Sequence, residues 1–126
     1  MARRARRQRF QILVQRVVSS LSSDVQHLLD NVAIVVATEP TANQRRESEL
    51  AFEDDLFGLY QGVPKSERGS GYSMVAPDQI TIFMGPLERA YGSRVELEEQ
   101  VRITVLHELG HHLGFDEDGL DAIGLA

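Results

Sequence analysis

The stretch that decides the fold lies near the C-terminus and reads His107-Glu108-Leu109-Gly110-His111-His112-Leu113-Gly114-Phe115-Asp116-Glu117. It contains the pattern HExxH, in which two histidines lie four residues apart. On a helix this spacing places the rings of His107 and His111 on one face, where both can bind one metal ion. Glu108 lies about 100° round the helix, within reach of a water on that ion, and is the predicted general base. The pattern therefore predicts a metal site with hydrolytic chemistry.

The residues before this motif predict one long helix. Ser93 is a candidate N-cap, and Glu96, three residues later, completes a capping box. Apolar residues recur at helical spacing from Val95 to Leu113. Gly114 favours a helix end, because glycine tolerates the left-handed conformation in which many helices stop. We therefore expect one buried helix of about twenty residues that carries the motif.

A third metal ligand is needed, because a catalytic zinc usually has three protein ligands and one position for water. The chain has no cysteine, so the available protein ligands are histidine, aspartate and glutamate. Asp116 and Glu117 follow the glycine at which the chain can turn back towards the ion. Two imidazoles and a carboxylate also suit iron, cobalt or nickel, so these residues alone do not identify the metal.

The motif resembles that of the minimal zincins, or mini-zincins, small zincin-like metallopeptidases grouped with the Asp-zincins by the pattern HExxHxxGxxD. The resemblance extends over most of the chain, from about Asn31 onward. It includes segments that look like the family's central strands, namely Leu59-Tyr60-Gln61-Gly62-Val63-Pro64 with Glu67-Arg68-Gly69 after it, and Pro77-Asp78-Gln79-Ile80-Thr81-Ile82-Phe83. The resemblance implies a peptidase with one catalytic Zn²⁺, held by His107, His111 and an acid at the last motif position, and with Glu108 as the catalytic residue.

The last motif position departs from the family pattern. It is Glu117 here, where the family has aspartate. Glutamate also binds zinc, but its longer side chain changes the backbone distance that the site requires. We assign the third-ligand role to Glu117 and keep Asp116, one position earlier, as the alternative. The acid that is not the ligand would be a solvated residue in an acidic turn.

Length and composition set the domain organisation that we expect. A chain of 126 residues with 42% hydrophobic residues fits one globular domain. Residues 1–16 hold six arginines and no acid, although the formal net charge of the whole chain is −6. We expect residues 1–9 to be a basic, disordered arm and residues 10–126 to be a single zincin-like domain. The arm is a weak candidate for binding nucleic acid or an anionic surface, because it has no interleaved aromatic residues.

The segment after the arm does not support secretion or membrane anchoring. Its apolar run from Ile12 to Val18 is broken by Gln15 and Arg16, and it is too short for a signal peptide or a membrane span. The pair Arg6-Arg7 lacks the uninterrupted apolar run of a twin-arginine signal. We therefore expect a cytoplasmic protein without a transmembrane segment.

The remaining patterns predict helices and strands that do not alternate strictly. We expect a helix over residues 10–21, a short second helix capped by Ser23 or Asp24, a central strand over 32–37, a loop or short helix within 38–55, a strand over 56–63, a hairpin of 72–75 with 79–84, and a short helix from Pro86 to about Tyr91. This order favours the α+β class, with a small mixed β-sheet packed against helices and the metal site on a C-terminal helix. The zincin resemblance implies the same architecture.

The resemblance also implies how a substrate would bind. A peptide would lie antiparallel along an edge strand beside the metal helix, held by main-chain hydrogen bonds, and we expect this edge at residues 72–75 or 79–84. Tyr72, Tyr91 and His112 are candidate donors to the oxyanion, although a structural role explains each of them as well. Two other functions stay open: a zinc-binding zincin-like protein without peptidase activity, and an interaction module that uses the basic arm.

Overall fold

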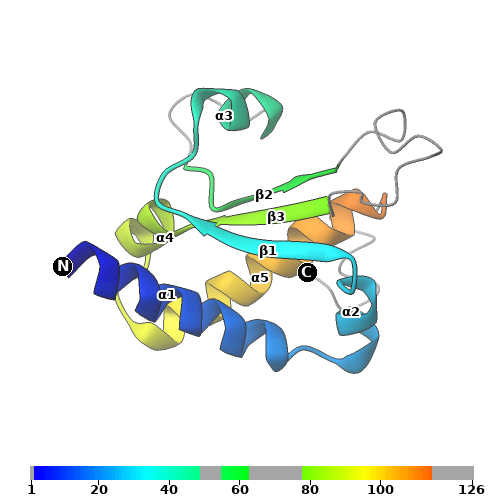
Figure 1. The fold of residues 1–126 in the computed structure, drawn as a ribbon, viewed down its shortest axis with the longest axis horizontal. Coiled ribbons are helices and arrows are strands. Elements are labelled where there is room, and N and C mark those ends of the chain that lie inside the picture. Colours follow the sequence, from blue (N-terminus) through cyan, green and yellow to red (C-terminus); the bar gives the residue numbers. More distant parts are fainter. Residues whose placement is uncertain (1, 49–54, 63–77, 115–126) are drawn as a thin grey trace.

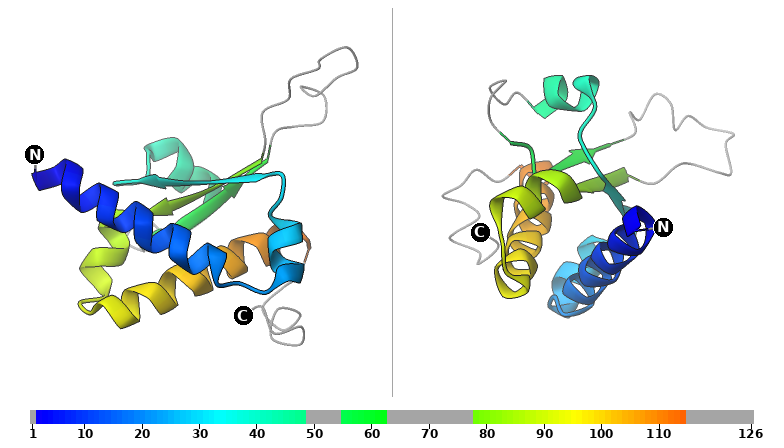
Figure 2. Two further views of the ribbon diagram at one scale, coloured as in Figure 1. Left: turned by 60° about the horizontal axis from the view of Figure 1, so that its bottom comes forward. Right: turned by 90° about the vertical axis from the view of Figure 1, so that its left-hand side faces the viewer.

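The structure is a computed structural model and describes residues 2–48, 55–62 and 78–114. Its elements in chain order are α1 (Ala2–Ser19), α2 (Ser23–Leu28), β1 (Val32–Ala37), α3 (Ala42–Ser48), β2 (Gly58–Gln61), β3 (Asp78–Phe83), α4 (Met84–Ala90) and α5 (Arg94–His112). The strands form one sheet in the order β1-β3-β2, in which β1 is parallel and β2 antiparallel to β3. Helices α1 and α5 lie against one face of this sheet, and α3 lies on the other side (Figures 1 and 2). The prediction of an α+β fold with a small mixed sheet is confirmed.

The middle strand, β3, joins the two layers of the core. Ile80 and Ile82 are fully buried in the larger apolar cluster, which includes Leu109 of α5. Phe83 is also fully buried but belongs to a smaller cluster with Leu56 and Leu59. Successive side chains of a strand point to opposite faces, so the alternation expected for this segment separates the two clusters. Because β3 is buried on both faces, its position is fixed, and so are the positions of β1 and β2, which pair with it.

Two predictions about strand positions are wrong for the described sheet. The strand over 32–37 was expected to be central, but β1 lies at one end of the strand order. Its side chains are mostly half-buried, and α1 lies beside it where a second strand was expected. The segment 79–84 cannot provide a substrate-binding edge, because β3 has a neighbour on both sides. Residues 72–75, the other half of the expected hairpin, lie outside the described residues.

The N-terminal segment is helical where we expected a disordered arm. Helix α1 begins at Ala2, and alanine and arginine both have high helix propensity. The arginines also contact the folded domain. Arg6 Nε donates to Glu88 Oε1 at 2.7 Å, and Arg7 Nη2 donates to the Val36 carbonyl at 2.7 Å. Residues 2–9 therefore extend the helix whose apolar face, beginning at Phe10, is buried in the core.

The short helices follow the expected capping chemistry with shifted boundaries. The N-cap of α2 is Ser22, one residue before the expected candidates, and its Oγ accepts from the Val25 N–H at 3.3 Å. Thr41 and Gln44 bond each other reciprocally at the start of α3, at 2.9 and 3.1 Å. Helix α4 begins at Met84, so Pro86 lies within its first turn, where a missing N–H is tolerated. None of the described helices is long and apolar enough to cross a membrane.

Candidate metal centre

The motif lies on the last turns of α5, as predicted. The helix begins after Ser93, whose Oγ accepts from the Glu96 N–H at 3.1 Å and donates to Glu96 Oε1 at 3.0 Å. At the other end the Leu113 N–H donates to the Leu109 carbonyl at 3.1 Å, and Gly114 has a φ of +92°. A side chain at this φ would be strained, which explains why the helix stops at a glycine. The two helix ends thus fix which residues of α5, and so of the motif, lie beside the sheet.

The two motif histidines face each other on one side of α5. Their ring centroids lie 4.2 Å apart, with an angle of 44° between the ring planes. His107 is half-buried and His111 is exposed, so the pair lies at the boundary between the protein and solvent. The structure therefore brings together the two imidazoles that the sequence predicts as ligands, and leaves them open on the solvent side.

Glu108 is held by the sheet. Its Oε1 accepts a hydrogen bond from the main-chain N–H of Tyr60, on β2, at 3.0 Å. Burial raises the pKa of Glu108, and this effect exceeds the opposing effects of the Tyr60 hydrogen bond and of the charges on His107 and His111. A carboxyl group with a raised pKa accepts and returns protons more readily near neutral pH than an ordinary glutamate does.

An open cleft of about 420 Å³ lies in front of these three side chains. One wall is the face of α5 that carries Gln100, Thr104 and the motif. The opposite wall is the segment 55–59, which leads into β2, and the end of α3 contributes Glu47 and Ser48. The cleft therefore follows the outer side of β2, which has β3 on its other side.

Gly58 allows α5 to approach the sheet closely at this cleft. A Cβ atom at this position would lie 2.5 Å from Thr104 Cγ2 and 3.2 Å from the Thr81 carbonyl oxygen. A contact of 2.5 Å requires a shift, and Thr104 is a stiff β-branched side chain that is itself buried. The absence of a side chain at residue 58 therefore sets the distance between β2 and the motif helix.

We expect Gly58→Ala to lower the free energy of unfolding by about 1–3 kcal/mol, because the added methyl group overpacks the interface with Thr104. Urea denaturation of the purified chain measures this change. Thr104→Ser removes the clashing Cγ2 atom, so the double variant Gly58→Ala/Thr104→Ser should lose less stability than the sum of the two single variants. Gly92→Ala is the matched control, since nothing lies within 4 Å of a Cβ atom there. Additive single effects would show that Thr104 is not the obstacle.

The third ligand is predicted to be an acid that follows the end of α5. Both candidates, Glu117 and Asp116, lie outside the described residues. Within residues 2–48, 55–62 and 78–114, no group of three or more histidine, aspartate or glutamate side chains is placed to hold a metal ion. The assignment of Glu117, with Asp116 as its alternative, therefore stays a prediction.

His112 points away from the histidine pair and joins a second cluster. Its ring stacks on Tyr60, with centroids 3.9 Å apart and 11° between the planes. The Tyr60 hydroxyl donates to Asp78 Oδ2 at 2.9 Å, and His112 Nε2 lies 3.7 Å from the same oxygen. These contacts connect the end of α5 to both β2 and β3. Tyr60 thus contacts the motif helix twice, through its ring and through its main-chain bond to Glu108.

The candidate oxyanion donors receive little support from their positions. His112 is engaged with Tyr60, and Tyr91 packs against Phe57 with ring centroids 5.8 Å apart. Tyr72 lies outside the described residues. The sequence predicts Tyr60 only as part of a strand, with no role at the site. An aromatic residue on a strand is usually explained by packing, so the pattern held no signal for its bond to Glu108.

The donor set fits a zinc ion. Two imidazoles one helical turn apart are ligands that zinc accepts, and the open side of the cleft leaves space for a water molecule. Glu108 is bound to the sheet by its hydrogen bond, which keeps it beside the histidine pair. His107 and His111 are therefore the described residues that would hold the ion.

Comparisons with known proteins identify the family of this chain. The sequence profile of a family described as zincin-like metallopeptidase matches residues 29–125, which include the whole motif. A solved structure of a conserved hypothetical protein from Thermus thermophilus is similar in fold, with a TM-score of 0.58 and 24% identity over 84% of this chain and 92% of that chain. No curated protein matches the sequence. Because the family profile covers most of the chain, the protein belongs to the family of zincin-like metallopeptidases.

Proposed function

We propose that this protein is a zinc-dependent peptidase that hydrolyses peptide bonds in the cleft between β2 and α5. The observation that carries the proposal is the shared position of His107, Glu108 and His111 at one wall of an open cleft. The other wall is a segment of extended chain at the outer side of the sheet. Two predicted zinc ligands, a predicted proton acceptor and a strand edge are thus adjacent, and peptide hydrolysis would use all three.

His107 and His111 would hold the zinc ion, with Glu117 as the third ligand and Asp116 as the alternative. When bound, zinc lowers the pKa of a water molecule and polarises a carbonyl group. The position of the two imidazoles depends on α5, whose burial against β3 fixes the helix that carries them.

Glu108 would act as general base and then as general acid. Its carboxylate takes the proton of the attacking water and passes it to the leaving amine. The hydrogen bond from the Tyr60 N–H to Oε1 orients the carboxylate. Because burial raises the pKa of Glu108, its carboxylate is a stronger base for the proton of the water than an ordinary glutamate is.

The substrate would lie along the outer side of β2. Tyr60 directs its N–H to this side, and main-chain groups of a strand alternate, so Gly58 directs its N–H and carbonyl to the same side. The Tyr60 N–H is used by Glu108, which leaves Gly58 as the strand position that can bond the main chain of a substrate. Main-chain pairing of this kind gives affinity with little sequence preference.

Zinc-loaded protein incubated with a proteome-derived peptide library should generate new peptide termini, read by mass spectrometry. A chelator should abolish these cleavages, and added zinc should restore them. A zinc-loaded chain that cleaves nothing in such a library would contradict the proposal and favour the zinc-binding protein without peptidase activity.

A further inference from the structure

The outer edge of β1 is open to pairing at its centre, at Ile34. Val36 directs its carbonyl away from β3, because that oxygen accepts from Arg7, and the Val32 N–H donates to the Leu29 carbonyl at 2.9 Å on the same side. Main-chain direction alternates along a strand, so Ile34, between them, directs both its N–H and its carbonyl outward. In the described sheet β3 is the only neighbour of β1, so no described strand uses this edge.

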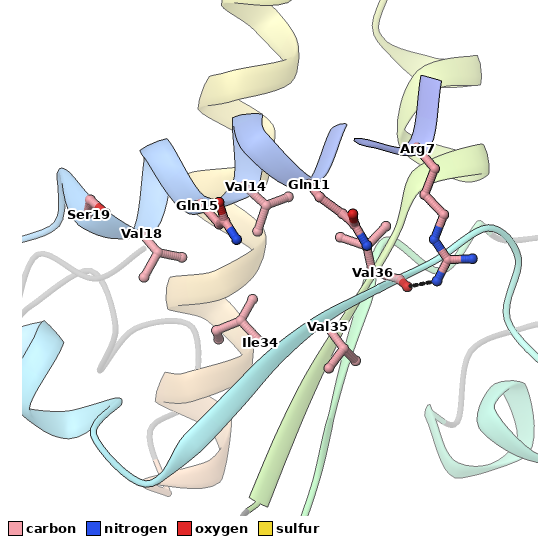
Figure 3. Close-up of a pocket in the computed structure, with 9 residues that line it drawn as sticks. All are labelled: Arg7, Gln11, Val14, Gln15, Val18, Ser19, Ile34, Val35 and Val36. Carbon is pink, nitrogen blue, oxygen red and sulfur yellow. Dashed lines mark hydrogen bonds between the residues drawn. The ribbon is translucent and has the colours of Figure 1, made fainter. Parts of the chain in front are cut away.

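A groove of about 740 Å³ runs between this edge and α1. Figure 3 shows the side chains of α1 that line it, among them Gln11 and Gln15, across from Ile34 to Val36 of β1. Val18, which is half-buried, adds apolar surface to the groove beside Gln15. The groove thus offers what an extended peptide needs: main-chain partners on one wall, amide side chains on the other, and apolar surface beside them.

The groove leads into a strongly basic cavity at the carboxyl end of β1. This second cavity, of about 750 Å³, shares Arg7 with the groove and is also lined by Arg3, Arg4, Arg6 and Arg89. Glu39 pairs with Arg89 at 2.6 Å, and Arg6 pairs with Glu88. Arg3 and Arg4 form no ion pair with any described residue. Their charges, at the positive end of the α1 dipole, are therefore left uncompensated.

We propose that this groove binds an extended segment of a partner protein, which adds a strand to β1 and places acidic residues in the arginine-lined cavity beyond Ala37. The strand edge supplies main-chain hydrogen bonds through Ile34. The arginines supply charge complementarity, since an acidic side chain is the protein group that matches Arg3 and Arg4.

The structure favours this occupant over a lipid surface or a nucleic acid. The apolar face of α1 is buried in the core, with Phe10 and Val14 each 3% exposed, so the helix has no apolar face to insert into a membrane. A nucleic acid would use the arginines but would leave the edge of Ile34 unused. The surface is also separate from the peptidase cleft, because β1 and β2 lie at opposite ends of the strand order. The inference therefore does not rest on the proposed function.

A fluorescein-labelled peptide of about ten residues tests the proposal, with alternating valine and threonine followed by a run of glutamates. Anisotropy titrations with the full chain, carrying Glu108→Gln so that the probe is not cleaved, should show saturable binding. N-methylation of alternate probe amides, in the register that faces β1, should weaken binding about tenfold or more, because it removes strand pairing without changing the protein. Amide chemical shifts should move at Ile34 and Val36 and not at Gly58.

Arg3→Glu/Arg4→Glu should weaken binding of the acidic probe at least about tenfold. Both side chains are exposed, and acids suit the start of a helix, so the variant should fold normally. Arg4→Glu and Arg16→Glu are a matched pair on the same helix, since Arg16 lies outside both cavities. The first should weaken binding and the second should not.

Three results would overturn the proposal. One is the absence of saturable binding up to about 1 mM probe. Another is an N-methylated probe, or the Arg3→Glu/Arg4→Glu variant, with unchanged affinity. The third is tighter binding of a labelled single-stranded oligonucleotide, or of anionic phosphatidylglycerol vesicles, than of the acidic peptide, which would reassign the arginine cavity to those ligands.

Discussion

Replacing Glu108 with glutamine should stop peptide hydrolysis while zinc stays bound. Glutamine keeps the size of the side chain and can still accept the hydrogen bond from the Tyr60 N–H, so the local structure should persist. It cannot take a proton from water at neutral pH, and loss of general acid–base catalysis costs about a hundredfold to ten-thousandfold in rate. We expect kcat to fall about a thousandfold on any peptide that the wild-type chain cleaves. The zinc content of the variant, measured by inductively coupled plasma mass spectrometry, should match that of the wild-type protein.

Glu99→Gln is the matched control for this substitution. Glu99 lies on the same helix but is exposed and bonded to Arg102, outside the cleft. Its substitution should leave kcat within about twofold of wild type, because an exposed ion pair contributes little. Hydrolysis that survives Glu108→Gln would contradict the role of Glu108 as the base. Loss of zinc together with activity would mean that this carboxylate is a ligand.

Replacing His111 with alanine should weaken zinc binding by more than about a hundredfold. Loss of a residue that only supports a ligand costs up to about a hundredfold in metal affinity, and loss of a ligand itself should cost more. The reason is that one of only two described ligand imidazoles is removed. Competition with a fluorescent zinc chelator measures the affinity, and circular dichroism checks that the exposed substitution leaves the fold intact. Activity should fall in parallel with zinc occupancy.

The neighbouring histidine provides the control. His112 stacks on Tyr60 and lies near Asp78, so His112→Ala should cost less than about tenfold in zinc affinity. Similar losses for the two variants would show that the rings of His107 and His111 do not form the metal pair. The same assay on Glu117→Ala and Asp116→Ala identifies the third ligand, because only the ligating acid should produce a loss as large as His111→Ala.

The motif helix was predictable because its signals are local. Ser93, Glu96 and Gly114 act on backbone groups within four residues of themselves, and the spacing of His107 and His111 follows from helix geometry alone. The short second helix, the strand at 32–37 and the strand at 79–84 were recognisable for the same reason. In the structure β1 has the predicted bounds, and β3 begins and ends one residue earlier than predicted.

The strand order was not predictable from these patterns. An apolar strand can be buried by a helix as well as by a neighbouring strand, and for this reason β1 looked central although it lies at an end of the sheet. The partner of β3 was expected at residues 72–75, close in sequence. In the structure β2, which precedes β3 by sixteen residues, takes that position in the described sheet. Such choices depend on contacts between segments that are distant in the chain.

The helical start of α1 was not predicted, because the high positive charge of residues 1–9 is typical of a disordered arm. Arginines near a helix N-terminus oppose the dipole and favour fraying. In the structure this cost is offset by contacts beyond the local sequence, of Arg6 with Glu88 and of Arg7 with Val36. Both partners lie far along the chain, so no local pattern could reveal them.

The hydrogen bond from Tyr60 to Glu108 would make the proposed catalysis sensitive to the register of the sheet. If β2 slipped by one residue against β3, the N–H facing α5 would belong to a neighbouring residue position, and the Tyr60 N–H would turn towards β3. Glu108 would then lose the hydrogen bond from the Tyr60 N–H. The main-chain groups of Gly58 would also no longer face the cleft. A misregistered sheet would thus disable the base and the substrate edge together, so only correctly paired molecules would be competent to cleave.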